Sequence, residues 1–163
     1  MKNLSKLKDV ELYTPDVFTD YRGDYWTTWK KGRSYDLEFN HDKVSVSRKN
    51  VLRGIHGDFK SYKLITCLHG EIYSVIVDNR KDSTTYLQWD WTILDDKNKN
   101  MILIPPGFGN SYLILSDKAV VHYKWSYEGD YADIDDQFTL KWNSLDLNIN
   151  WPISNPILSK RDR

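Results

Sequence analysis

The sequence lacks the features that mark several large classes of protein. Its single cysteine, Cys67, excludes a disulfide within the chain, and its setting in an apolar run predicts a buried core thiol. The 23 basic side chains balance 23 acidic ones, so no overall positive field favours nucleic acid or an anionic membrane as a partner. No apolar run approaches the roughly 20 residues that span a bilayer. Residues 1–6 are polar, unlike a signal peptide, so we expect a cytoplasmic protein.

Long amphipathic helices, internal repeats and low-complexity linkers are also missing, so residues 1–163 are expected to form one domain. Turn residues instead separate short runs rich in β-branched and aromatic side chains, which predicts an all-β sandwich or small barrel. One helical turn is expected within Lys31–Leu37. The predicted strands are Trp26–Trp29, Lys43–Ser47, Val51–Ile55, Lys63–Leu68, Glu71–Val77, Tyr86–Ile93, Met101–Ile104, Ser111–Leu115, Ala119–Trp125 and Phe138–Trp142.

Arg53 and His56 lie in a segment with strand character, an odd number of residues apart. A flat strand would point their side chains to opposite faces. Gly54 lies between them, and glycine inside a strand often marks a bulge that re-aims side chains. A bulge could bring a fixed positive charge and a titratable base to one cavity, which suits an anionic substrate that must lose a proton.

Several motifs extend this pattern along nearly the whole chain. They are Phe18-x-Asp20-x-Arg22-Gly23, Ser47 to His56, Lys63-Leu64, Val77-Asp78-x-Arg80-Lys81-x-Ser83, Ile104 to Phe108, Tyr123-Lys124, Trp142-Asn143, Trp151-Pro152 and Leu158 to Asp162. In this order they resemble the 3,5-epimerases of nucleotide-linked 4-keto-6-deoxy sugars. The resemblance implies a cupin-type jelly-roll β-barrel, no cofactor, no metal, and a homodimer that exchanges its N-terminal strands.

The resemblance also implies catalytic roles. His56 matches the base that removes a proton beside the C4 ketone, and Asp162 matches the carboxylate that orients it. Tyr123 matches the acid that protonates the opposite face, and Lys63 matches the lysine near the ketone oxygen. Because side chains alternate along a strand, Tyr123 is expected to point into the barrel and His122 out of it.

Other residues match positions that bind the substrate. Arg53 and Arg22 match arginines that hold the diphosphate, Lys43 matches a polar residue on the nucleotide side, and Phe18 is expected near the partner's active site. Two departures from the rhamnose-pathway enzymes, Asp58 for a glutamine and Asn110 for a histidine, are expected to line the sugar pocket. They make the chain more similar to the GDP-4-keto-6-deoxy-heptose branch, used for bacterial surface polysaccharide. Thr27, where an acidic residue would recognise thymine, also favours another base such as guanine.

Three other functions compete with this interpretation. A metal-dependent cupin oxygenase needs clustered histidines, and a cupin-type 3,4-ketoisomerase needs paired histidines, whereas His56 has no second histidine near it. A non-catalytic jelly-roll module could bind carbohydrate with the plentiful aromatic residues, but it would not require arginine, histidine, lysine and tyrosine inside the barrel. dTDP-4-keto-6-deoxyglucose remains the alternative substrate of an epimerase.

Overall fold

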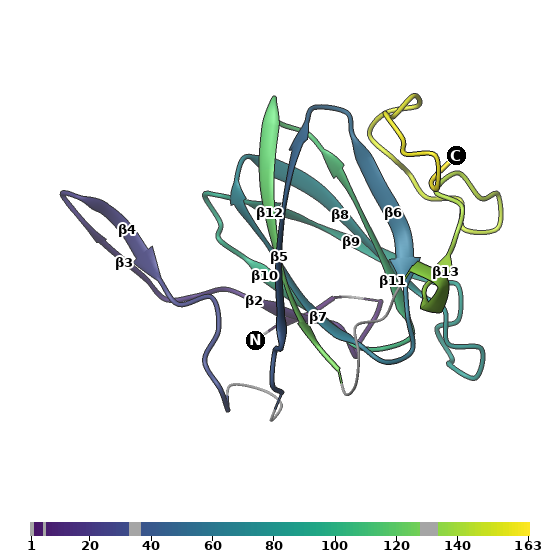
Figure 1. Cartoon of the computed structure of the whole chain (residues 1–163), viewed down its shortest axis with the longest axis horizontal. Helices are drawn as coiled ribbons and strands as arrows, with labels where there is room; N and C mark the ends of the chain where they lie inside the picture. Colours follow the sequence, from purple (N-terminus) through teal and green to yellow (C-terminus); the bar gives the residue numbers. More distant parts are fainter. Residues whose placement is uncertain (1, 5, 33–36, 128–133) are drawn as a thin grey trace.

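Two antiparallel sheets face each other in a computed structural model that describes residues 2–4, 6–32, 37–127 and 134–163 (Figure 1). In spatial order, the six-stranded sheet contains β1 (Lys2–Asn3), β2 (Glu11–Tyr13), β10 (Met101–Ile104), β7 (Tyr62–His69), β12 (Lys118–Ser126) and β5 (His41–Arg48). The five-stranded sheet contains β13 (Phe138–Thr139), β6 (Leu52–Gly57), β11 (Phe108–Ile114), β8 (Glu71–Asp78) and β9 (Trp89–Asp95). The described residues contain one 3₁₀ turn, Ile134–Asp136, and no α-helix. The arrangement is the predicted cupin-like jelly roll.

The main hydrophobic core fills the space between the two sheets. Ile72 and Ile76 enter it from β8, while Ile65, Ile102 and Val121 enter it from the six-stranded sheet, and all five are at most 1% exposed. Their alternation along the strands places the next residues on the other face of each sheet. Cys67 belongs to this core, as predicted.

Most predicted barrel strands are confirmed, Met101–Ile104 with both ends as predicted and the others with ends that move by at most three residues. The prediction at Trp26–Trp29 was wrong, because the strand there is β4 (Gly23–Trp26), which pairs with β3 (Val17–Asp20) in a hairpin. Two further ends were misplaced: β9 begins only at Trp89, because Leu87 takes a turn conformation with φ 60°, and β13 ends at Thr139. The helical turn expected within Lys31–Leu37 falls largely on residues 33–36, outside the described part.

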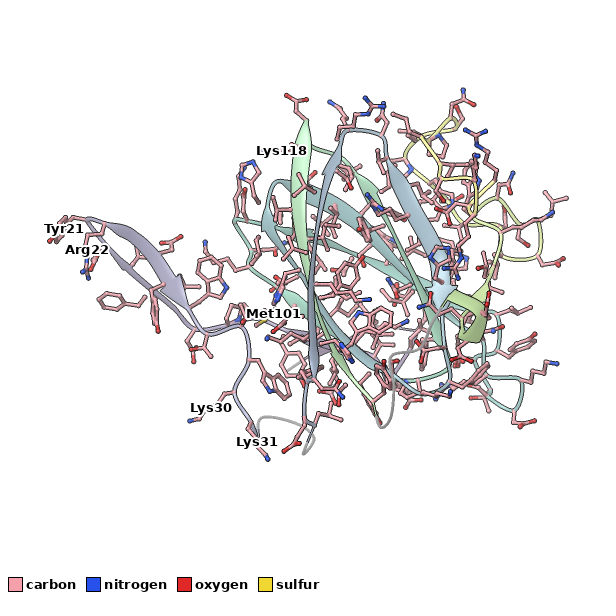
Figure 2. All side chains as sticks on the ribbon, in the orientation of Figure 1. Tyr21, Arg22, Lys30, Lys31, Met101 and Lys118 are labelled. Atoms are coloured by element: carbon pink, nitrogen blue, oxygen red, sulfur yellow. The ribbon has the colours of Figure 1, made fainter. Side chains whose placement is uncertain are left out.

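The β3–β4 hairpin projects from the barrel as an arm (Figure 1). Tyr21 and Arg22 lie at its tip, remote from the barrel (Figure 2). Phe18 is 61% and Tyr25 74% exposed, so the arm presents apolar surface to solvent. Apolar groups in an extended arm indicate a surface that packs against something else.

The C-terminal segment runs along the edge of the barrel next to β6. Ile157 forms a parallel bridge to Val51, accepts a hydrogen bond from the Leu52 N–H at 3.0 Å, and donates to the Asn50 carbonyl at 2.8 Å. These contacts hold the last residues against the barrel. Among the described residues, no helix is both long and apolar enough to cross a membrane.

Candidate active site

One cavity takes side chains from both sheets and from the C-terminal segment. Its volume is about 370 Å³. The lining residues are mainly polar or aromatic, unlike the aliphatic core behind them. They are Lys43, Val44, Ser45, Arg53, Gly54, His56, Lys63, Asn110, Tyr112, Tyr123, Trp125, Gln137, Ser159, Arg161 and Asp162.

The predicted bulge at Gly54 is confirmed. Where β6 pairs with β11, His56 lies opposite Asn110 and Arg53 lies opposite Tyr112. Two residues of β6 but only one of β11 separate these pairs, so β6 carries one extra residue. Gly54 has φ 108°, and a Cβ there would lie 2.6 Å from the Asn110 carbonyl oxygen. Only glycine fits this bend without displacing backbone. As a result Arg53 and His56 both line the cavity despite their odd spacing.

His56 and Asp162 form the expected pair, with Nε2 2.7 Å from Oδ1. The Ser159 hydroxyl donates to the other carboxylate oxygen at 2.7 Å. Burial alone would raise the pKa of Asp162, but these partners outweigh it and the pKa is lowered, so the carboxylate stays charged. The tautomer that carries its proton on Nε2, beside the carboxylate, has its lone pair on Nδ1, where the ring can accept a proton.

Lys63 is a buried cation with its own counter-ion. Its ammonium lies 3.1 Å from Asp58 Oδ2, and the two side chains are 3% and 1% exposed. Burial lowers the pKa of Lys63, while the Asp58 carboxylate opposes that shift. Backbone N–H groups of Lys60 and Ser61 donate to Asp58 Oδ1. The prediction that Asp58 lines the pocket was wrong: it lies behind Lys63, which shields it from the cavity.

Tyr123 reaches the cavity from β12, on the sheet opposite His56. Val121 and Tyr123 point inward, whereas His122 and Lys124 point outward and both contact Asp42, at 3.0 and 2.9 Å. The predicted orientation of this strand is therefore confirmed. Burial, and next the neighbouring Tyr112, raise the pKa of the Tyr123 phenol well above its usual range, so it holds its proton at neutral pH.

Positive side chains line the same cavity around the base and the phenol. Lys43, Arg53 and Arg161 join Lys63 there, and Asn110 lies opposite His56 in the strand register. Ser47 accepts a hydrogen bond from Arg53 Nε at 3.0 Å, which fixes the guanidinium. Such a set suits a ligand that carries more than one negative charge, such as a diphosphate.

Sequence reasoning missed some cavity residues. Trp125 pairs with Lys63 in register, and the ammonium groups of Lys63 and Lys43 lie 4.6 and 4.7 Å from its ring centroid. Its position two residues after Tyr123 was the available signal, because i and i+2 share a strand face. Arg161 is held by Thr139 and Gln137, residues far from it in the chain, and no local pattern indicated this.

Phe18, Arg22 and Thr27 lie apart from this cavity within one chain. Phe18 and Arg22 sit on the arm, where Arg22 pairs with Asp20 at 2.6 Å. Thr27 borders a different hollow, together with Asp16 and Lys30. A role for Phe18 and Arg22 in substrate binding therefore stays a prediction that requires a second copy of the chain.

The cavity brings together groups suited to acid–base chemistry. Within the described ranges, no group of three or more histidine, cysteine, aspartate or glutamate residues could hold a metal ion. Burial raises the pKa of the Cys67 thiol to about 12, so it is not a nucleophile. A base with an orienting carboxylate, a protonated phenol and a buried ammonium together can move a proton at a carbon next to a carbonyl.

Comparison with known proteins gives consistent matches over nearly the whole chain. The family profile of dTDP-4-dehydrorhamnose 3,5-epimerase matches residues 4–163. The enzyme of that name from Shigella flexneri is 36% identical over 97% of this chain and 90% of its own length. A Legionella pneumophila epimerase solved with dTDP-4-keto-L-rhamnose has a TM-score of 0.91 and 30% identity, covering 98% of this chain and 88% of that one. ChmJ, a 3'-monoepimerase from Streptomyces bikiniensis solved with dTDP-quinovose, has a TM-score of 0.90 and 26% identity, covering 99% and 84%.

Proposed function

This chain belongs to the dTDP-4-dehydrorhamnose 3,5-epimerase family, and on that premise we propose how its cavity works and on which sugar. The chain is a carbohydrate epimerase, an isomerase. Its reaction is epimerisation at C3, at C5 or at both carbons of a nucleotide-diphospho-4-keto-6-deoxy sugar. The observation that carries the proposal is the placement of His56 and Tyr123 on opposite sheets around one cavity.

The first step is proton abstraction by His56. The hydrogens on C3 and C5 flank the C4 ketone and are weakly acidic, so a neutral imidazole can remove one. Asp162 keeps the Nε2–H tautomer and stabilises the imidazolium that forms. The Lys63 ammonium stabilises negative charge on the enolate oxygen, and it does so in a buried setting where charge interactions are strong.

The second step is proton return by Tyr123 on the other face of the sugar. A phenol that stays protonated at neutral pH is a reservoir for this proton. No cofactor or metal takes part in this scheme, because the ketone of the substrate already activates both carbons. Arg53, Lys43 and Arg161 line the same cavity, and in this scheme they bind the diphosphate.

The substrate we propose is GDP-4-keto-6-deoxy-heptose, in a pathway of surface polysaccharide synthesis. Asn110 supports this substrate, because Asn110 lines the cavity at the position where rhamnose-pathway enzymes carry histidine. Asp58 does not support it, because Asp58 lies behind Lys63 and does not line the cavity. dTDP-4-keto-6-deoxyglucose is the second candidate, favoured by the names of the relatives. We further propose a cytoplasmic homodimer in which the β3–β4 arm of each copy brings Phe18 and Arg22 to the other copy's cavity.

Deuterium exchange tests the reaction and the substrate together. The protein is incubated in deuterated water with each of the two nucleotide sugars in turn, and C3 and C5 are followed by NMR. Deuterium gain at either carbon is expected with one of them, and the labelled carbons show at which centres a proton is removed. A folded protein that exchanges neither substrate would contradict the proposed function.

Variants of His56 and Tyr123 assign the two roles. His56→Asn is expected to abolish exchange at both carbons, whereas His122→Asn, a matched change on the outward face of β12, keeps it. Tyr123→Phe should slow inversion on the order of 10²-fold or more while exchange by His56 persists. Full epimerisation by Tyr123→Phe would show that another group is the acid.

A further inference from the structure

Trp125 lies between two lysines of the cavity. In the six-stranded sheet β12 has β7 on one side and β5 on the other, so Lys63 and Lys43 approach Trp125 from opposite sides. Lys63 is the register partner of Trp125, and Lys43 pairs with Tyr123, two residues before Trp125 on the same face. Both ammonium groups lie over the indole, at 4.6 and 4.7 Å from its centroid. One ring therefore contacts two cations from different strands.

The setting of this ring makes the two contacts strong. Trp125 is 8% exposed and the Lys63 side chain 3%, so little water weakens the attraction between the ring electrons and the cations. Tryptophan offers the best aromatic face for such a contact. The two ammonium groups also repel each other, since the charge of Lys63 adds to burial in lowering the Lys43 pKa. The indole thus offsets a repulsion between two cations in one cavity.

The two lysines differ in what else holds them. The Lys63 ammonium lies 3.1 Å from Asp58 Oδ2, in a pair whose side chains are both buried. Lys43 lies on β5, the edge strand of its sheet, and carries its charge on a flexible four-carbon stem. Loss of the indole is therefore expected to displace the Lys43 ammonium further than the Lys63 ammonium.

We propose that Trp125 is a positioning residue that holds the Lys43 and Lys63 ammonium groups at the two ends of the bound sugar. This inference rests on the proposed function, in which Lys43 binds the diphosphate and Lys63 faces the ketone oxygen. A nucleotide-diphospho-4-keto sugar carries these groups on C1 and C4, at opposite corners of a six-membered ring. Two cations fixed around one rigid indole match the two oxygen-rich ends of this class of substrate.

Trp125 acts through the lysines rather than on the reacting atoms. Its indole N–H is a donor that does not titrate at neutral pH, so the ring neither takes a proton from C3 or C5 nor returns one. The ring face attracts a cation without accepting its proton. The Lys63 N–H groups that are not directed at Asp58 can therefore still donate to a substrate oxygen.

Steady-state kinetics, with the nucleotide sugar that is turned over, test the two contacts. Trp125→Leu is expected to raise KM about tenfold through Lys43, while kcat falls about threefold or less because Asp58 still pairs with Lys63. Trp125→Phe keeps an aromatic face and should restore most of the loss. Trp91→Leu removes a tryptophan that is 47% exposed on β9, outside the cavity, and should change neither constant.

A double-mutant cycle shows whether Trp125 acts through Lys43. Lys43→Met removes the charge and keeps a long side chain. In that background Trp125→Leu is expected to change KM by less than about twofold, because the contact that it breaks is already gone. An equal KM ratio in both backgrounds would overturn the inference, since Trp125 would then act independently of Lys43. So would a wild-type KM for Trp125→Leu, or a Trp125→Phe variant as impaired as Trp125→Leu.

Nucleotide binding separates this inference from the proposed function. GDP and dTDP are titrated in turn into each protein by calorimetry. The nucleotide that binds wild type is expected to bind Trp125→Leu about fivefold or more weakly, and to bind Lys43→Met and the double variant with equal affinity. Equal affinity for wild type and Trp125→Leu would overturn the role of Trp125 and leave the proposed function intact. A wild-type protein that neither binds a nucleotide nor turns over either sugar would contradict the proposed function, on which this inference rests.

Discussion

Asp58 lies behind the cavity and affects the charge of Lys63, which lines the cavity. The carboxylate touches no part of the cavity, yet it opposes the fall in the Lys63 pKa that burial causes. Backbone N–H groups and the ammonium together keep the pKa of Asp58 low, against the effect of its own burial. The charge at Lys63 therefore depends on Asp58.

Asp58→Asn is expected to lower the free energy of unfolding by about 3–5 kcal/mol, because an unpaired buried ammonium remains. The pKa of Lys63 should fall at the same time, so turnover at neutral pH drops with it. Urea unfolding and kcat against pH measure the two effects.

The double variant Asp58→Asn with Lys63→Met is the matched control. It removes both charges, so stability should recover in part while turnover stays lost. If Asp58→Asn alone kept both wild-type stability and activity, the ion pair would have no controlling role.

At the scale of single elements, the bulge in β6 fixes which residues face the cavity. Gly54→Ala is expected to lower the thermal midpoint and to abolish deuterium exchange, because Gly54 has φ 108° and its added Cβ would meet the Asn110 carbonyl. Differential scanning calorimetry and the exchange experiment measure the two effects. Gly32→Ala, at φ 80° but with open space around it, is the control that separates backbone strain from steric conflict.

The turn after β8 is fixed by the buried carboxylate of Asp78. Arg80, Ser83 and Thr85 all hydrogen-bond it and lower its pKa, although burial alone would raise it. A lowered pKa means that its stabilising effect is present above the unfolded value of about 3.8 and is lost as pH falls below it.

The free energy of unfolding of the wild type should therefore fall in acid, because Asp78 becomes protonated. Asp78→Asn is expected to cost about 1–3 kcal/mol at pH 6 and to lose less stability than wild type between pH 4 and pH 2. Urea midpoints at these pH values test it. Parallel curves for the two proteins would exclude Asp78 as a cause of acid sensitivity.

The elements differ in how far the sequence could predict them. Strands such as β7, β8 and β12 are long β-branched runs between clear turns, so local patterns located them. β1 and β2 span only two and three residues and are held by pairing with distant strands, which no local pattern shows. The bulge at Gly54 and the inward face of β12 followed from alternation, whereas Arg161 reaches the cavity through contacts with a remote turn.

At the scale of the whole molecule, a substitution in the β3–β4 arm tests the proposed homodimer. Phe18→Asp places a charge on the exposed apolar face of β3, so it is expected to dissociate the proposed dimer and to raise KM, because Arg22 would no longer reach the other cavity. Sedimentation velocity and steady-state kinetics measure both. Leu145→Asp, at a side chain 93% exposed on the C-terminal segment, is the control. A dimer that survives Phe18→Asp would contradict an exchange through the arm.

The proposed base and the proposed acid belong to different sheets, and this has a mechanical consequence. His56 moves with the five-stranded sheet and Tyr123 with the six-stranded sheet, so the gap between them is set by how far apart the aliphatic core holds the two layers. The layer of Ile72, Ile76 and Val121 is thus a spacer for the reaction as well as a source of stability. Thinning or thickening that spacer changes the width available to a sugar ring without altering any atom that touches it.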